Sequence, residues 1–126
     1  MRYDSFEELP IWQEAIKLAR DIYMVTGRNN WRTEYELKNQ LKRAVISVSS
    51  NIAEGYERQN KNELLRYLGI SKGSLGEMKS QVYLALELKY LNTDEFALLK
   101  GKIEGLGKQI GGFMKYLRQQ KIKKDA

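Results

Sequence analysis

The sequence contains no cysteine and no histidine. Without cysteine there is no disulfide framework, thiolate nucleophile or sulfur ligand for a metal, and without histidine the commonest general base and metal ligand are missing. Apolar runs also fall short of the roughly eighteen residues that a membrane span needs, and the N-terminus lacks the apolar segment of a signal peptide. The sequence therefore predicts a cytoplasmic protein with no membrane partner, and it disfavours hydrolytic and redox enzymes.

Proline is almost absent as well, because Pro10 is its single occurrence, and there is no long Gly/Ser linker. Such a chain is expected to form long helices joined by short connections. With 126 residues there is room for one domain with one core, so we assign residues 1–126 to a single domain. We expect helices at about 10–27, 33–58, 61–90 and 94–119, and a flexible basic C-terminal tail at 120–126.

Local signals mark the ends of these helices. Pro10 suits the first helical position, and Gly27 is expected to stop the first helix because glycine tolerates a left-handed conformation. Thr33 with Glu36, and Asn60 with Glu63, have the spacing of capping boxes. Asn92 to Glu95 is expected to turn the chain and to cap the fourth helix.

Apolar residues recur with a helical period along all four segments, which predicts an all-α protein. Amphipathic helices with short turns favour an antiparallel up-down-up-down four-helix bundle, and a pair of long hairpins that needs a partner is the alternative. The expected core stripes include Trp12, Ile16, Ala19, Ile22, Tyr23 and Thr26 on the first helix, and Leu64, Leu68, Ser71, Leu75, Met78, Val82 and Ala85 on the third. Apolar residues outside these stripes, such as Ile46, Ile70 and Tyr83, suggest oligomer contacts. The alternative is that they are single exposed apolar residues, which are common on protein surfaces.

The second helix is unusually polar from Ser47 to Arg58, and its register carries Asn51 and Gly55 onto the core stripe. Glycine costs a helix about 1 kcal/mol relative to alanine, so we expect this glycine and those of the third and fourth helices to allow close backbone approach. Residues 69–77 are expected to face the motif, with serines satisfying Asn51 and Glu54. The predicted structural motif comprises Ser47, Asn51, Glu54, Gly55, Arg58, Gly73, Ser74 and Glu77.

Glu54 could also be read as a catalytic acid or, with Glu77, as half of a metal site. The chain has no Glu-x-x-His motif, so the di-iron bundle arrangement is absent. A buried carboxylate needs partners, and this requirement favours a structural polar network. We therefore expect no enzyme activity, no cofactor and no metal.

Basic residues outnumber acidic ones by 22 to 16, and residues 92–126 hold eight of the former and four of the latter. Such a basic excess suggests a polyanion such as nucleic acid as the partner, held through its phosphates without sequence readout, although a basic tail can also be merely solubilising. The candidate contacts are Lys38, Lys42, Arg43, Lys108, Lys115, Arg118, Lys121, Lys123 and Lys124.

Residues 6–12 (FEELPIW), 47–55 (SVSSNIAEG) and 66–68 (RYL), with Gly73, Ser74 and Glu77, resemble the four-helix bundle proteins encoded in intervening sequences of bacterial large-subunit (23S) ribosomal RNA genes. The similarity covers nearly all of residues 6–118, and Ser71 replaces a typical alanine. The resemblance implies a left-handed up-down four-helix bundle that assembles as a homopentamer, without established enzymatic activity. Distantly, the chain is similar to accessory proteins of diversity-generating retroelements, which are thought to hold RNA and a polymerase.

These observations favour a non-enzymatic homo-oligomeric bundle, as a pentamer, that binds RNA through basic surface residues. The alternative is a protein-interaction or scaffold module with no nucleic-acid role, because aromatic side chains often anchor protein partners. Its candidate anchors are Tyr3, Trp31, Tyr35, Tyr56, Tyr67 and Tyr83.

Overall fold

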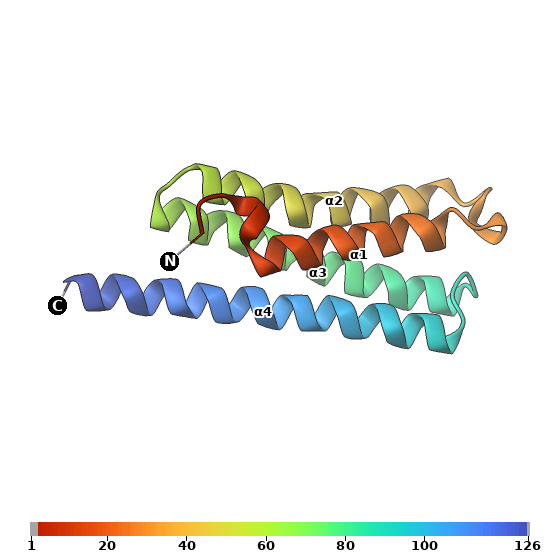
Figure 1. Ribbon diagram of the computed structural model, residues 1–126. Coiled ribbons are helices and arrows are strands. Elements are labelled where there is room, and N and C mark those ends of the chain that lie inside the picture. The colour runs from red at the N-terminus through yellow and green to blue at the C-terminus, as the bar shows by residue number, and fades with distance from the viewer. Residues whose placement is uncertain (1–2, 126) are drawn as a thin grey trace.

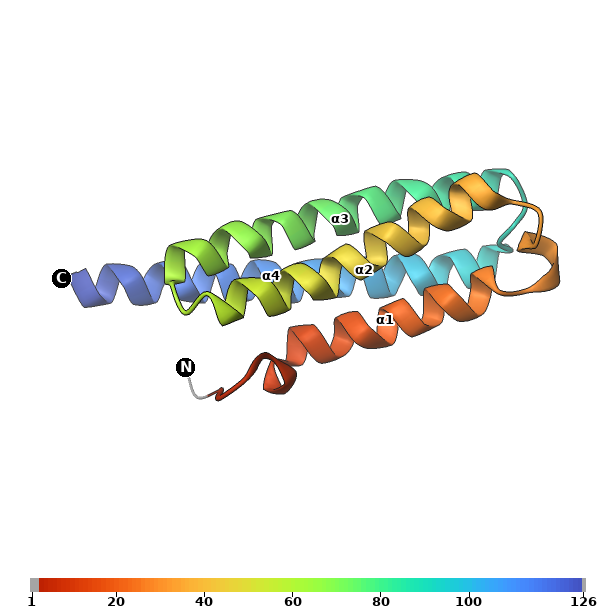
Figure 2. The same cartoon turned by 90° about the horizontal axis from the view of Figure 1, so that it is seen from above.

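Four long helices form a bundle in the computed structural model, which describes residues 3–125 and the side chains of residues 3–120. They are α1 (Pro10–Thr26), α2 (Tyr35–Glu57), α3 (Lys61–Glu87) and α4 (Thr93–Asp125), with short 3-10 helices η1 (Phe6–Glu8) and η2 (Asn29–Trp31). Successive helices run in opposite directions (Figure 1). Figures 1 and 2 together place α2 opposite α4 and α1 opposite α3, so each helix has two neighbours. The all-α bundle is as predicted, and its handedness stays a prediction.

Side-chain caps begin three of the helices. Asn60 Oδ1 accepts a bond of 2.9 Å from the Glu63 amide, as the capping-box spacing predicted. At α4, Asn92 and Glu95 cap each other's amides at 2.8 and 3.0 Å. The predicted cap of α2 is wrong by one residue: η2 carries the turn further, and Glu34, not Thr33, accepts the Leu37 amide at 2.9 Å.

The helix ends differ from the sequence expectation in two places. Gly27 has a φ of −81°, so it does not use the left-handed conformation expected of it. That conformation occurs instead at Gln59 and Lys89, where the φ angles are 49° and 68°. After Lys89 the Tyr90 amide donates to the Ala85 carbonyl at 2.8 Å, the closing bond of a Schellman motif. Moreover, α4 continues to Asp125, so the backbone of 120–125 extends the helix where a tail was predicted.

The core lies along the bundle axis, and α3 supplies it as predicted: all seven residues of its expected stripe are buried. The expected stripe of α1 is correct at Ile22 and Thr26 and wrong elsewhere, because Ile16 and Tyr23 are exposed and Trp12 is only half-buried. Apolar residues cover more than half of the circumference of α1, and the bundle buries a neighbouring side of the helix. The buried residues of α1 are Ile11, Ala15, Leu18, Ile22, Val25 and Thr26.

The groove between α1 and α4 is the least filled of the helix seams. A hollow of about 250 Å³ lies there over Leu18 and Leu106, with Gly105 on its α4 wall. Lys102 Nζ bridges it by pairing with Asp21 Oδ2 at 2.6 Å. No helix between residues 3 and 125 is both long and apolar enough to cross a membrane.

Candidate functional site

The polar motif of α2 faces α3, and its first half is a short hydrogen-bonded network. The Asn51 side-chain amide donates to the Ser47 carbonyl at 2.8 Å and to Ser47 Oγ at 3.0 Å. From α3, Ser74 Oγ donates to Ser47 Oγ at 2.9 Å. One helical turn along α3, the fully buried Ser71 donates to the Val48 carbonyl at 2.8 Å. The short serine side chains suit this seam, because Ser71 reaches a backbone carbonyl of α2 and Ser74 reaches the Ser47 hydroxyl.

The helices α2 and α3 approach each other closely at Gly55. A Cβ atom at this position would lie 2.7 Å from the Tyr67 Cβ and 3.2 Å from Leu64 Cδ1, distances that the packing cannot accommodate without a shift. The expectation of close approach is therefore correct for Gly55. It is wrong for Gly69, Gly73 and Gly76 of α3 and for Gly101, Gly105 and Gly112 of α4, where nothing within 4 Å would meet a Cβ.

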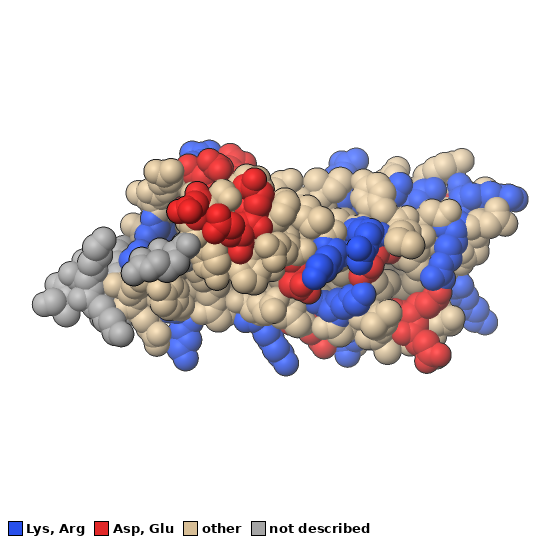
Figure 3. Space-filling view, in the orientation of Figure 1, with Lys and Arg blue, Asp and Glu red and all other residues tan. Residues whose placement is uncertain are grey.

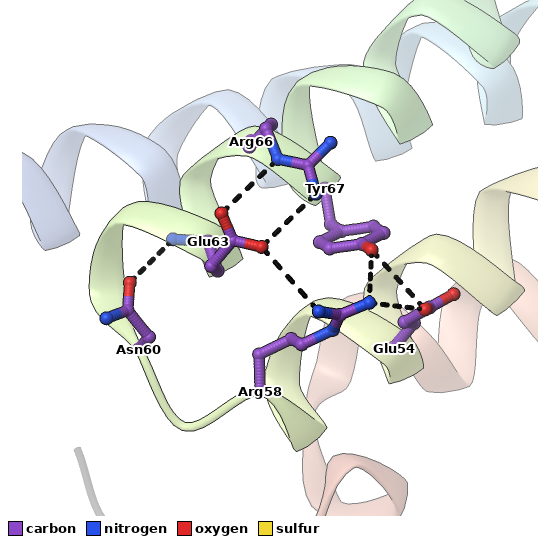
Figure 4. Close-up of polar contacts among 6 residues, drawn as sticks. All are labelled: Glu54, Arg58, Asn60, Glu63, Arg66 and Tyr67. Carbon is purple, nitrogen blue, oxygen red and sulfur yellow. Dashed lines mark hydrogen bonds and ion pairs between the residues drawn. The ribbon is translucent and has the colours of Figure 1, made fainter.

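The second half of the motif forms a separate ionic cluster at the α2–α3 connection (Figure 4). Arg58 Nη2 donates to Glu54 Oε2 at 3.0 Å and to the Tyr67 hydroxyl oxygen at 2.8 Å. The Tyr67 hydroxyl donates in turn to Glu54 Oε2 at 3.3 Å. Glu54 is thus satisfied by Arg58 and Tyr67, and the predicted bond between Glu54 and the serines is wrong.

Glu63 extends this cluster to a second arginine. Its carboxylate lies 3.2 Å from Arg66 and 3.9 Å from Arg58, and the Arg66 guanidinium stacks over the Tyr67 ring at 4.5 Å. The hydrogen bond from Arg66 lowers the pKa of Glu63, and the bond to Glu54 raises the pKa of Arg58. Both shifts favour the charged forms, so the cluster holds two helix ends together and offers no poised proton donor or acceptor.

The remaining motif residues lie outside these contacts. Gly73 and Glu77 are exposed on the outer side of α3, so the structure does not bring them to the motif. Within residues 3–120, no group of three or more acidic side chains is placed to hold a metal ion.

The structure places the predicted nucleic-acid contacts at two ends of the bundle. Lys38, Lys42 and Arg43 lie near the start of α2, whereas Lys115 and Arg118 are exposed near the far end of α4 (Figure 1). With a helical rise of about 1.5 Å per residue, the two groups are roughly 25 Å apart along the axis. Lys108 is exposed between them, and the side chains of Lys121, Lys123 and Lys124 lie outside the described residues.

Charge is segregated along residues 3–43, a feature that the sequence reasoning missed. Residues 3–16 contain four acidic and no basic residues, whereas residues 17–43 contain seven basic and three acidic ones. Figure 3 shows the two groups on one face, with Asp and Glu over η1 and Lys and Arg over the later part of α1 and the α1–α2 connection. Over residues 1–31, four basic and five acidic residues nearly cancel, so only a shorter window would have revealed the basic run of Lys17, Arg20 and Arg28.

Two lysines of this basic end lie against tyrosine rings. Lys42 Nζ of α2 is 4.8 Å from the centre of the Tyr23 ring of α1, and Lys38 Nζ is 5.5 Å from that of Tyr35. Among the anchors proposed for a protein partner, Trp31 and Tyr67 are buried and unavailable, whereas Tyr35 and Tyr83 are well exposed.

Comparison with known proteins agrees with this architecture. A crystal structure of a protein of unknown function from the S23 ribosomal protein family of Bacteroides thetaiotaomicron has the same fold, with a TM-score of 0.76 at 17% sequence identity, over 83% of this chain and 98% of the other. No protein of curated function matches the sequence. The family model for the 23S rRNA-intervening sequence protein matches residues 7–112. The chain therefore belongs to the family of 23S rRNA-intervening sequence proteins.

Proposed function

We propose that this protein is a non-enzymatic homo-oligomer, with five copies as its family resemblance implies, that holds RNA by its phosphates. The single observation that carries the proposal is the segregated charge: seven basic residues against three acidic ones in residues 17–43, beside the acidic residues 3–16. Sequence-independent phosphate contacts need only such a basic surface. An oligomer repeats that surface in every copy.

Basic side chains at the start of α2 are free of ion pairs within the described residues, which also supports phosphate binding. Ion pairs within residues 3–120 engage Lys17, Arg20, Arg28, Arg58, Arg66, Lys79, Lys100 and Lys102. Lys38, Lys42 and Arg43 are not among them, so phosphates would not have to displace a carboxylate. Lys108, Lys115 and Arg118 of α4 are not among them either, so we place the principal contacts at the start of α2 because its lysines lie beside tyrosine rings.

Exposed apolar side chains support the homo-oligomer. Ile70, Leu84 and Leu88 lie along one flank of α3, and each is more than two-fifths exposed. Their spacing of fourteen and four residues keeps them on one side of the helix. The exposed Glu77 lies between Ile70 and Leu84 on this side and interrupts the apolar surface, but a second copy that covered Leu84 and Leu88 would remove both side chains from water.

The absence of catalysis is also part of the proposal. The chain lacks histidine and cysteine, and the ionic side chains of the motif are paired with one another at the α2–α3 connection. Their shifted pKa values stabilise charged forms and so do not favour proton transfer near neutral pH.

The test combines molar mass by light scattering with fluorescence anisotropy of a labelled RNA at several salt concentrations. We expect a mass of five chains and an affinity that falls with a log–log slope of about −0.7 per phosphate contact on single strands. Reversal of Lys38, Lys42 and Arg43 to glutamate should reduce both the affinity and the slope. The matched control reverses Lys121, Lys123 and Lys124, and we expect a smaller loss. Salt-independent binding, or none at low salt, would contradict RNA binding, and a monomeric mass would contradict the oligomer.

A further inference from the structure

We propose that the basic end binds unpaired RNA, with bases stacked on Tyr23 and Tyr35 and phosphates held by Lys38 and Lys42. This inference rests on the proposed function and narrows it to single strands and to one small surface. We call these four residues the tyrosine–lysine row.

The four side chains form a continuous row across α1 and α2. Tyr35, Lys38 and Lys42 follow at spacings of three and four residues, so they share one side of α2. Lys42 then reaches across the seam to Tyr23 of α1, 4.8 Å from the ring centre, while Lys38 lies 5.5 Å from the ring of Tyr35. Two ammonium groups therefore lie between two rings along the row, in the order ring, cation, cation, ring.

Both rings are open to solvent. Tyr35 is 66% exposed and Tyr23 44% exposed, so neither ring fills the core. Within residues 3–120, neither hydroxyl makes a hydrogen bond to another side chain or to the backbone, in contrast to the hydroxyls of Tyr56 and Tyr67. Both rings therefore lie at the surface of helices, where they neither fill the core nor anchor an internal hydrogen bond.

The chemistry of this row suits a single strand better than a duplex. A ring offers a flat apolar face on which any unpaired base can stack, whereas the bases of a duplex already stack on each other. A lysine over an exposed ring is only weakly held, so its ammonium group can move to a phosphate at little cost. Interleaved aromatic and basic residues are the pattern used for single strands without sequence preference.

The charged groups around the row are compatible with a polyanion. Arg20 precedes Tyr23 by one helical turn and adds positive charge, which Asp21 partly offsets at 3.9 Å. Of the nearby carboxylates, Glu34 is occupied as the cap of α2 by the Leu37 amide, and Asp21 also pairs with Lys102 Nζ at 2.6 Å. Glu36 and Arg43 lie about 100° around α2 from the row, and their spacing of seven residues places them on the same neighbouring side, where their charges offset each other.

The test measures anisotropy with a labelled twelve-nucleotide oligo-U and with a twelve-base-pair RNA duplex. We expect the wild-type protein to prefer the single strand, and the Tyr23→Ala/Tyr35→Ala variant to bind oligo-U at least tenfold more weakly. The log–log salt slope should be unchanged, because the phosphate contacts remain. Tyr35→Phe should bind like the wild type, since it keeps the ring.

Tyr83→Ala is the matched control. Tyr83 is 47% exposed and has Lys100 at 5.7 Å from its ring, but it lies on α3, away from the row. We expect wild-type affinity from this variant. Far-UV circular dichroism and thermal melting would establish that all variants fold.

The outcomes separate the tyrosine–lysine row from the proposed function on which it rests. Equal affinity for duplex and single strand, or full affinity in the Tyr23→Ala/Tyr35→Ala variant, would show that bases do not stack on the row. If the glutamate reversals of Lys38, Lys42 and Arg43 still abolish binding in that case, the proposed function stands. If wild-type protein binds neither RNA at low salt, both are wrong.

Discussion

Where α2 meets α3, backbone and side-chain stems touch directly, whereas α1 and α4 face each other across a hollow that an ion pair bridges. At the first seam, Gly55 lies against Tyr67, and Ser71 bonds to the Val48 carbonyl. At the second, Lys102 reaches Asp21 beside a hollow of about 250 Å³. The distinctive polar sequence thus belongs to the tight seam, and the open seam is held by exposed charges.

The difference between the two seams is clearest at their glycines. Gly55 and Gly105 carry the same helix penalty of about 1 kcal/mol, but only Gly55 gains a contact that another residue would prevent. A glycine within a helix therefore indicates close packing only where a neighbour occupies the space of the missing side chain. The sequence does not contain that information, because the neighbour comes from another helix.

The largest expected effect follows from filling the tight seam. Gly55→Leu should destabilise the fold by about 3 kcal/mol or more, because the new Cβ would lie 2.7 Å from the stem of Tyr67 and the rest of the side chain has no space. Urea and thermal denaturation followed by circular dichroism measure the change. A Gly55→Leu protein with wild-type stability would show that the two seams do not differ as described.

Gly105→Ala is the matched control in the open seam. Nothing within 4 Å would meet its Cβ, so we expect a gain of up to about 1 kcal/mol from improved helix propensity. A loss of stability would contradict the open seam. If that loss depended on protein concentration, it would place this flank of α4 in a contact between copies.

A smaller effect is expected from Ser71→Ala, which removes one hydrogen bond from the tight seam. Ser71 is fully buried and donates to the Val48 carbonyl at 2.8 Å, so its loss should cost about 1 kcal/mol. The exposed Ser80 on the same helix provides the control, and Ser80→Ala should be neutral or slightly stabilising. Equal effects of the two substitutions would show that the buried hydroxyl does not contribute.

The sequence predicted the parts of the fold that depend on one helix at a time. The spacing of Leu64, Leu68 and Leu75 placed the buried stripe of α3 correctly, and Asn60 was correctly identified as its cap. On α1, large apolar residues such as Ile16 and Tyr23 offered a second stripe on an adjacent side. Periodicity could not choose between them, because the choice depends on which side chains fit beside the neighbouring helices.

The candidate sites were less predictable, because they depend on distances between helices. Ser47, Asn51 and Ser74 were correctly grouped, because they belong to two polar segments that were expected to face each other. The serines were wrong as partners of Glu54, because the sequence could not show that Tyr67 reaches its carboxylate from α3. The row of Tyr23 and Lys42 was missed for the same reason: its members come from different helices.

The ion pair of the open seam should contribute less than either tight contact. Lys102 and Asp21 are partly exposed, at 44% and 21% of their side-chain surface, and pairs of this kind contribute about 0.2–1 kcal/mol. A double-mutant cycle of Lys102→Met and Asp21→Asn measures the coupling, which should nearly vanish in about 1 M salt through screening. A coupling that survives high salt would mean that the seam is drier than the hollow suggests.

The smallest effects are expected from acid, which protonates the carboxylates of the exposed ion pairs that α3 forms. Hydrogen bonds from Arg66 and Lys79 lower the pKa values of Glu63 and Glu104 below their ordinary 4.5. A carboxyl group whose pKa is lower in the folded state stabilises the fold above the unfolded value, and this contribution disappears as the pH falls through the folded value. We therefore expect a melting temperature that begins to drop below about pH 4.5, with a shallower drop in Glu63→Gln/Glu104→Gln. Glu77→Gln is the control, because Glu77 forms no ion pair within residues 3–120 and should leave the acid limb unchanged. An equally steep drop in wild type and both variants would show that groups other than Glu63 and Glu104 cause the acid sensitivity.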